Sequence, residues 1–278
     1  MKHKYVCILA IVIAIGIIWW YFLSQNWITQ ENFDENKNYL EGVDVIYWIN
    51  LERSSERRNN MLKMFSNKVF EDIPNIRINA VDGQQLNLDD YFVVKPEIEL
   101  SNNQYACLLS HLIAIKEFEK TDANIALIME DDASLDYQKF WNHSIQEIIE
   151  QAPQDWEVIK LAMIPYNCNP DEYKHQQQEF SDSWTASTLA YLINKKGAKK
   201  ISEHWINNKY DIDLNIIPVA DMYIYIVLRT YDYIIPYFTY PDNNDSDLNG
   251  TKRDTLGDIC KNSVSRALMN ASDFLSTL

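Results

Sequence analysis

The stretch Ile125–Asp136, IALIMEDDASLD, is the part of the chain from which its fold is best interpreted. Its first five residues form an unbroken apolar run, which is typical of a strand buried on both faces of a sheet. The run stops at three consecutive acids, Glu130, Asp131 and Asp132. Because alternate side chains of a strand point to opposite faces, we expect Glu130 and Asp132 on one side and Asp131 on the other.

Three acids at the end of a buried strand have two interpretations. Their carboxylate oxygens are the ligands that a hard divalent cation prefers, so the triplet is a candidate metal site. A polar strand end that leads into a solvated loop would have the same composition. The choice depends on what else lies at the same edge of the sheet.

A second polar segment follows the apolar run VDVIYWI at residues 43–49. It begins with Asn50 and carries Arg53 and Arg57 at the start of a helical pattern. A helix N-terminus and guanidinium groups both favour anions, so this segment is a candidate phosphate site. An arginine-rich first turn is also typical of ordinary solvated surface.

Apolar periodicity predicts that strands and helices alternate along the chain. We expect strands at residues 43–49, 75–80, 125–129, 158–164, 185–193 and 233–238, and helices near residues 54–65, 101–120, 140–151, 198–205 and 222–228. This order indicates an α/β fold with a mostly parallel central sheet covered on both faces. Ligands of such sheets bind beyond the C-terminal ends of the strands, where segment 50–58 and the acid triplet both fall. The sequence therefore predicts a nucleotide diphosphate bridged by a divalent ion.

Composition restricts the class of protein. The chain has 278 residues, 47% of them hydrophobic, and a formal net charge of −15. The acidic balance argues against nucleic-acid binding, which needs a cationic surface. Four cysteines are too few for a disulfide scaffold, and their spacing contains no CxxC zinc motif. One disulfide among Cys107, Cys168 and Cys260 is possible, and its pairing stays open.

The N-terminus contains a candidate membrane segment. Residues 5–23 are nineteen consecutive uncharged residues, which is long enough to cross a bilayer. Lys2 and Lys4 precede the run and acids follow it, so we expect a type II signal-anchor with the main domain on the non-cytoplasmic side. A cleaved signal peptide is the alternative. We expect a cytoplasmic tail at residues 1–4, a stem at 24–42, the main domain at 43–249 and a polar tail at 250–278.

The chain resembles glycosyltransferase family 25, because seven short motifs occur in the same order as in that family. This family contains lipopolysaccharide galactosyltransferases and collagen hydroxylysine galactosyltransferases. The motifs are Ile49-Asn50-Leu51 with Arg53 and Arg57, Ala80-Val81-Asp82-Gly83, Ala106–His111, Glu130-Asp131-Asp132, Lys196-Gly197-Ala198, Pro218–Asp221 and Ser246-Asp247-Leu248. Two motifs depart from the family pattern, since Ala106 replaces the usual glycine and the Pro218–Asp221 segment is one residue longer.

The resemblance implies a GT-A-like, nucleotide-sugar-binding domain that transfers a hexose from UDP-galactose or UDP-glucose with inversion. It implies Mn²⁺ or Mg²⁺ held by Glu130 and Asp132, with a glycan or a hydroxylysine-type protein as acceptor. Asn50, Arg53, Arg57 and Asp131 are the expected donor-binding residues. We expect Asp221 to be the catalytic base, with Asp247 as second candidate, and His111 to be structural.

An alternative from another class is a catalytically inactive relative that acts as a binding or adhesion module. Such a module has no need for a complete acid triplet or for both arginines, so their presence favours the enzyme. If the source is eukaryotic, the catalytic domain is expected in the lumen of the endoplasmic reticulum or the Golgi apparatus.

Overall fold

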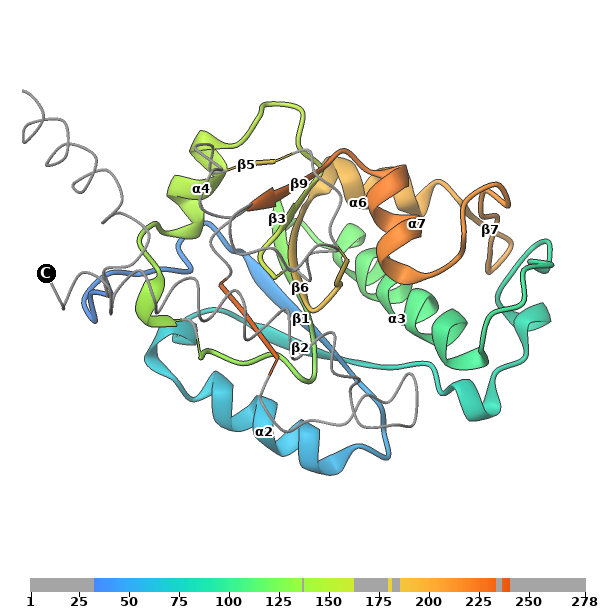
Figure 1. Cartoon of the computed structure of the whole chain (residues 1–278), viewed down its shortest axis with the longest axis horizontal. Coiled ribbons are helices and arrows are strands. Elements are labelled where there is room, and N and C mark those ends of the chain that lie inside the picture. The colour runs from blue at the N-terminus through green and yellow to red at the C-terminus, as the bar shows by residue number, and fades with distance from the viewer. Residues whose placement is uncertain (1–32, 137, 163–179, 182–185, 234–236, 241–278) are drawn as a thin grey trace, which may run out of the picture.

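The computed structural model describes residues 33–136, 138–162, 180–181, 186–233 and 237–240 (Figure 1). Within these ranges one sheet of seven strands has the order β2-β1-β3-β6-β4-β9-β5. The strands are β1 (Val45–Asn50), β2 (Asn75–Asn79), β3 (Ile125–Glu130), β4 (Val158–Lys160), β5 (Phe180–Ser181), β6 (Ala190–Asn194) and β9 (Thr230–Tyr233). Strand β6 is antiparallel to both its neighbours and β5 is antiparallel to β9, whereas the other strands run in one direction. The prediction of a mostly parallel α/β sheet is confirmed.

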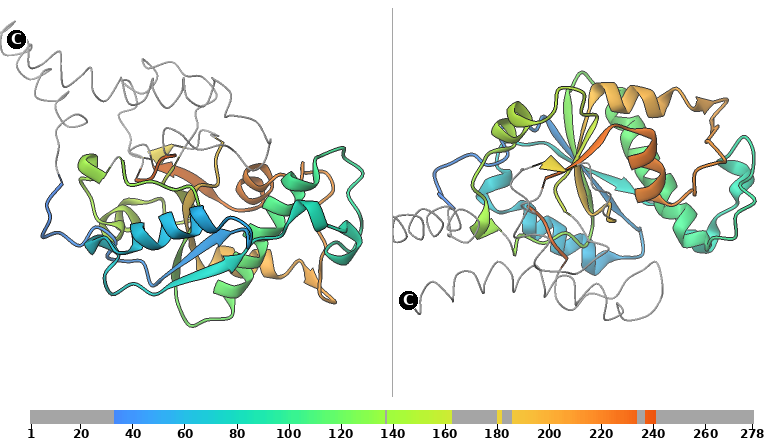
Figure 2. Two further views of the ribbon diagram at one scale, coloured as in Figure 1. Left: turned by 90° about the horizontal axis from the view of Figure 1, so that it is seen from below. Right: turned by 45° about the horizontal axis from the view of Figure 1, so that its top comes forward.

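Helices cover both faces of this sheet (Figures 1 and 2). The longer helices are α2 (Ser55–Phe65), α3 (Asn102–Glu119), α4 (Ile145–Gln151), α6 (Lys195–Ser202) and α7 (Ala220–Val227). Helices α3, α6 and α7 pack on one face, and α2 and α4 pack on the other. Short 3₁₀ helices are η1 (Lys68–Phe70), η2 (Gly83–Gln85), η3 (Leu88–Asp90) and η4 (Gln138–Phe140).

The sheet has one hydrophobic core on each face, and the alternation of side chains along β1 explains how one strand contributes to both. Val45, Tyr47 and Ile49 pack with α3, while Ile46 and Trp48 pack with α2 and α4. All five side chains are at least nine-tenths buried. The apolar run of β3 is likewise buried on both faces, as its sequence predicts, so the sheet lies in the middle of the molecule.

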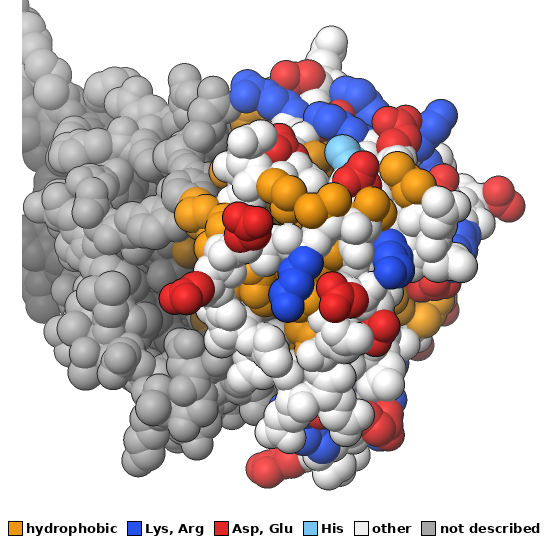
Figure 3. All heavy atoms as spheres, turned by 90° about the vertical axis from the view of Figure 1, so that its right-hand side faces the viewer, with side chains coloured by type: hydrophobic (Ala, Val, Ile, Leu, Met, Phe, Trp, Pro, Cys, Tyr) orange, Lys and Arg blue, Asp and Glu red, His pale blue; other side chains and the backbone are white. Residues whose placement is uncertain are grey.

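A small hairpin of β7 (Trp205–Ile206) and β8 (Lys209–Tyr210) projects at one end of the molecule (Figure 1). The segment before α3 lies beside it, because the amide of Val93 donates to the carbonyl of Tyr210 at 2.9 Å. Figure 3 shows this side of the molecule, where hydrophobic side chains lie among acidic and basic ones. The exposed large hydrophobic residues of these two segments are Val93, Val94, Ile98 and Ile206.

Several element boundaries differ from the sequence prediction, among them the start of β6, which is Ala190 and not 185, and the end of β4, which is Lys160 and not 164. Helix α4 begins at Ile145, not at 140, because Ser144 and Glu147 form a capping box. Helix α6 begins at Lys195, not at 198, because the Asn194 side chain accepts from the amide of Gly197. The last predicted strand was also misplaced, since the segment 230–233 is the part that pairs with β4.

The packed unit extends into the predicted stem. Tyr39 and Leu40 are 1% and 0% exposed, and the Tyr39 ring lies 5.7 Å from the ring of Trp141. Lys37 binds Glu147 of α4 at 2.6 Å. The predicted anchor at 5–23 and tail at 250–278 lie outside the described residues. Among the helices that the structure does describe, none has the length and apolarity needed to cross a bilayer.

Candidate functional site

A cleft opens where β1 and β3 end side by side. Its volume is about 570 Å³, counting the part that is open to solvent, and it is lined by the end of β1, the start of α2, residues 80–83, the first half of α3 and the end of β3. The two strands are parallel neighbours, with Ile49 opposite Glu130. Segment 50–58 and the acid triplet therefore meet at one edge, as the sequence predicts.

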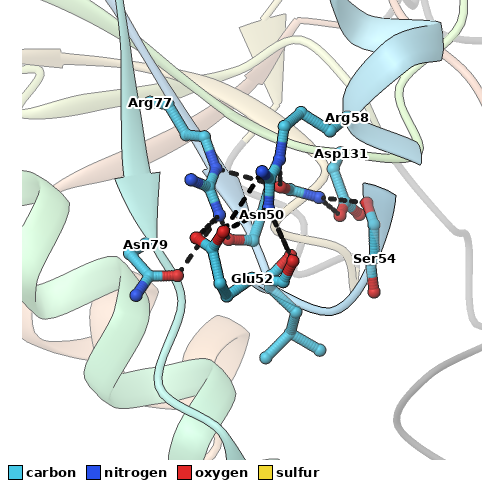
Figure 4. A network of polar contacts seen from close by, with 8 residues as sticks. Asn50, Glu52, Ser54, Arg58, Arg77, Asn79 and Asp131 are labelled. Atoms are coloured by element: carbon cyan, nitrogen blue, oxygen red, sulfur yellow. Dashed lines mark hydrogen bonds and ion pairs between the residues drawn. The ribbon is translucent and has the colours of Figure 1, made fainter. Parts of the chain in front are cut away.

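Asn50 is the centre of the polar network shown in Figure 4. Its side chain is 1% exposed, and its amide nitrogen donates to Oδ2 of Asp131 at 2.6 Å. Its amide oxygen accepts from Nε of Arg58 and from Nε of Arg77, both at 3.0 Å. Both ends of the amide are thus used inside the protein, and Asn50 holds the first turn after β1 against the acid triplet.

Arg57 connects helix α2 to two of the three acids. Its guanidinium lies 2.7 Å from Oδ1 of Asp131 and 3.3 Å from Oδ2 of Asp132. The two acids are 8% and 5% exposed. Burial raises the pKa of Asp131, while the charge of Arg57 and the hydrogen bond from Asn50 act in the opposite direction. A buried carboxylate needs such a partner, so Arg57 is part of what keeps the triplet at this edge.

Arg53 lies at the mouth of the cleft and pairs with Asp82 of the segment before η2. The Arg53 side chain is 41% exposed, in contrast with the 18% of Arg57. The amide of Gln84 donates to Asp82 at 2.9 Å, and this bond and Arg53 lower the pKa of Asp82. Of the two arginines predicted to bind phosphate, Arg53 is therefore the more accessible one.

Glu130 turns away from the other two acids, toward helix α3. It accepts a hydrogen bond from Oγ1 of Thr188 at 2.6 Å, and its Oε1 lies 3.5 Å from Nε2 of His111. The expectation that Glu130 and Asp132 share one side is wrong. Strand β3 ends at Glu130, so strand alternation does not extend to Asp132, which reaches Arg57 together with Asp131.

The donor chemistry of the triplet fits a hard divalent cation, because carboxylate oxygens are what Mn²⁺ and Mg²⁺ prefer. Of the predicted ligands, Glu130 lines the cleft and accepts from Thr188, whereas Asp132 is not among the lining residues and pairs with Arg57. Their assignment to a metal stays a prediction.

Asp221 lies in the first turn of α7, next to the segment that holds Glu130. Its Oδ1 accepts from the amide of Met222 at 2.9 Å, and its Oδ2 lies 3.4 Å from the amide of Ser187. Ser187 precedes Thr188, the hydrogen-bond partner of Glu130. Asp221 is thus connected to the cleft floor, and its role as base stays a prediction. Asp247 lies outside the described residues.

Several residues of the site carry no signal in the sequence. Arg77 and Thr188 reach Asn50 and Glu130 only because segments that are distant in the sequence become neighbours. Gly83 does carry a signal as part of its motif. A Cβ at Gly83 would lie 2.8 and 2.9 Å from the backbone nitrogen and Cα of Asn103, so any larger residue here would push η2 and α3 apart.

Comparison with curated proteins finds procollagen galactosyltransferase 2 from Homo sapiens, which is 28% identical over 179 residues, covering 58% of this chain and 27% of that protein. Procollagen galactosyltransferase 1 from Danio rerio is 26% identical over 181 residues, covering 58% and 28%. A glycosyltransferase 25 family member from Aedes aegypti is 26% identical over 190 residues, covering 58% and 28%. The match therefore spans little more than a quarter of the length of these relatives.

Among solved structures, the apo form of mouse xyloside xylosyltransferase 1 aligns with 74% of this chain and 75% of that chain, at 9% identity and a TM-score of 0.30. That degree of likeness is too low to establish a shared fold.

The profile of glycosyltransferase family 25 (LPS biosynthesis protein) matches residues 43–216. This match contains the segment 50–58, the acid triplet and the cleft between them. Because it covers more than half of the sequence, the chain belongs to glycosyltransferase family 25.

Proposed function

We propose that this protein is a metal-dependent, inverting glycosyltransferase that moves a hexose from a UDP-sugar to a hydroxyl group of a glycan or a protein. One observation carries the proposal: Arg57 and Asn50 bind Asp131 directly, so the candidate anion site and the acid triplet form one cleft. A nucleotide diphosphate needs both kinds of group, cationic for its phosphates and acidic for the ion that bridges them.

The donor binds across the end of β1 in this proposal. Arg53 is exposed at the cleft mouth and offers a guanidinium group to a phosphate or uridine oxygen. Asn50 and Arg57 are held by their own contacts and keep the turn in place. Asp131, buried behind them, fixes the position of Arg57.

Glu130 and Asp132 would hold the divalent ion, which when bound neutralises the negative charge that grows on the leaving diphosphate. Thr188 orients Glu130, and Arg57 orients Asp132, before any donor arrives. Such preorganisation matters because carboxylates already in place cost little reorganisation during reaction.

Asp221 accepts the proton of the acceptor hydroxyl. It stands in the first turn of α7, where its Oδ1 accepts from the amide of Met222 and its Oδ2 lies 3.4 Å from the amide of Ser187. General base catalysis of this kind contributes about 10²–10⁴-fold to the rate. Asp247 remains the second candidate.

The names of the relatives support galactose as the sugar and a collagen-type hydroxylysine as one possible acceptor class, with glucose and a glycan as the other choices. A GT-A-like arrangement is consistent with the mostly parallel sheet and the acid triplet at its edge. We also propose that residues 5–23 anchor the chain as a type II membrane protein.

The test is UDP release by the detergent-solubilised full chain with UDP-galactose or UDP-glucose and Mn²⁺, with and without candidate acceptors. We expect Asp132→Asn to reduce release by more than about 100-fold, since the ion contributes several kcal/mol. We expect Asp221→Asn to reduce it by about 10²–10⁴-fold.

Asp155→Asn is the matched control, because Asp155 forms an exposed ion pair with Arg229 outside the cleft lining. If folded wild-type chain released no UDP from any donor, the enzyme proposal would be wrong. The inactive binding module would then be the better interpretation, and binding to glycans would be measured next.

A further inference from the structure

Three side chains that could bind a metal converge on the floor of the cleft. Cys107 and His111 lie four residues apart on α3, so they share one face of the helix. Glu130 ends β3 opposite them. The sulfur, a ring nitrogen and a carboxylate oxygen of these residues all lie within 4.8 Å of one another.

His111 is oriented toward this cluster but makes no hydrogen bond there. Its side chain is 1% exposed, its Nδ1 lies 3.1 Å from the hydroxyl of Tyr191, and its Nε2 has no hydrogen-bond partner among the described residues. The nearest carboxylate oxygen, Oε1 of Glu130, lies 3.5 Å from Nε2. A buried ring nitrogen normally has a hydrogen-bond partner, and Nε2 of His111 has none among the described residues. A cation between Nε2 and the Glu130 carboxylate would bind both groups.

We propose that Cys107, His111 and Glu130 form a binding site for a borderline divalent cation of the zinc type. A thiolate, an imidazole and a carboxylate are the ligand types that zinc takes, whereas Mn²⁺ and Mg²⁺ prefer oxygen alone. An open zinc site has three protein ligands and a fourth coordination position for a water or substrate, which here would face the cleft. The zinc site rests on the geometry of this cluster and not on sugar transfer. It shares Glu130 with the Mn²⁺ or Mg²⁺ site of the proposed function, so zinc bound here would compete with that ion for this carboxylate.

The distances require only a small contraction. Zinc–ligand bonds of about 2.0–2.3 Å place neighbouring ligand atoms of a tetrahedral site roughly 3.3–3.8 Å apart. The separation of His111 and Glu130 already falls in this range. The three ligand atoms lie within 4.8 Å of one another, so the sulfur of Cys107 would have to approach by no more than roughly 1.5 Å when the ion binds.

The surrounding charges favour a bound cation. The carboxylates of Glu130, Asp221 and Asp132 all interact electrostatically with Cys107, and negative charge from several sides attracts a positive ion. Zinc replaces the thiol proton, so each binding event forms one zinc–sulfur bond and releases that proton to solvent. In the tautomer with the proton on Nδ1, the Tyr191 hydroxyl accepts from Nδ1–H at 3.1 Å, which leaves the Nε2 lone pair for the ion.

Cobalt(II) is the probe, because its complexes with thiolates absorb light and its coordination resembles that of zinc. We titrate it into the tag-free, metal-free full chain in detergent, with no UDP-sugar present. We expect one cobalt per chain, a thiolate-to-cobalt charge-transfer band, and loss of this band when zinc is added.

Variants assign the ligands. We expect Cys107→Ser to remove the charge-transfer band and His111→Gln to weaken zinc binding by at least about 100-fold. Tyr191→Phe keeps the ring but not the hydroxyl, and should weaken binding by about 10–100-fold. His204→Gln is the control, since His204 lies on an exposed segment and contacts the carbonyl of Asp211.

An unchanged band in Cys107→Ser would overturn the proposal, as would the absence of any band in the wild type. If Cys107→Ser does not fold, X-ray absorption of the zinc-loaded wild type is measured instead. One sulfur atom in the coordination shell of zinc supports the site. A coordination shell of nitrogen and oxygen alone rejects it. Zinc binding without UDP release would contradict only the proposed function, and UDP release without zinc binding would contradict only the zinc site.

Discussion

At the residue scale, Arg57 has the strongest structural connection to the proposed chemistry. One guanidinium group bridges Asp131 and Asp132, so the start of α2 and the acid triplet are held by the same side chain. A planar fork of donors suits two acceptors at once, whereas a lysine ammonium is a single point charge. The position of Asp132 therefore depends on the shape of Arg57 as well as on its charge.

We expect Arg57→Lys to reduce UDP release by about 10–100-fold, which corresponds to the loss of one charge-assisted hydrogen bond of roughly 1.5–3 kcal/mol. The measurement is steady-state release with UDP-galactose and Mn²⁺, with circular dichroism to show that the fold is kept.

Arg229→Lys is the control for this substitution, because Arg229 is half exposed and pairs with exposed Asp155. Full activity of Arg57→Lys would show that charge alone is enough at this position.

At the element scale, the start of α4 joins residues 33–42 to the domain. Glu147 accepts from the amide of Ser144 and from Nζ of Lys37, both at 2.6 Å. The hydrogen bond from Lys37 and the one from the Ser144 amide lower the pKa of Glu147. The same carboxylate therefore caps the helix and holds the segment that precedes β1.

The lowered pKa gives this contact a defined pH dependence. A carboxyl group that is more acidic when folded stabilises the protein above its unfolded pKa, and the contribution is lost as the pH falls through the folded pKa. We expect Glu147→Gln to cost about 1 kcal/mol at neutral pH, since the group is partly exposed. The difference in thermal midpoint between variant and wild type should shrink as the pH is lowered from about 7 toward about 3.

Glu150→Gln provides the comparison on the same helix, because exposed Glu150 accepts only from the neutral side chain of Gln146 in the contacts described. It should change the midpoint little at either pH. A difference for Glu147→Gln that stays constant with pH would mean that the ionised carboxylate is not the source.

At the scale of the whole molecule, the described residues form a sheet with helices on both faces (Figure 1). The predicted anchor precedes them in the sequence. We expect the full chain to stay with the membrane fraction after alkaline carbonate extraction, because nineteen uncharged residues are enough to span the hydrocarbon core. Its intact mass should include the N-terminal residues.

Replacing Ile13 with Arg should shift the chain toward the soluble fraction, since a charge at the centre of a span costs about 2.5–3.5 kcal/mol. Val45→Ile, a small change inside the core of the domain, serves as control. A mature chain that lacks residues 5–23 would support the cleaved signal peptide.

The sequence by itself determined the α/β class, the order of most strands and helices, and the meeting of segment 50–58 with the acid triplet. These depend on local periodicity and on the rule that parallel strands end at one edge, so neighbouring residues carry enough information. The first residues of α4 and α6 were harder to predict, because one N-cap residue, Ser144 or Asn194, determines where each helix begins.

Only the tertiary structure decided which side each acid faces and which distant residues reach it. Glu130 meets Cys107 and His111 because β3 ends there and α3 packs against that face, and Arg77 reaches Asn50 because β2 lies beside β1. Spacing along the chain contains no zinc motif of the CxxC kind, yet three ligand types converge. The reason is that convergence depends on strand order and on where a strand ends, which periodicity along one segment does not specify.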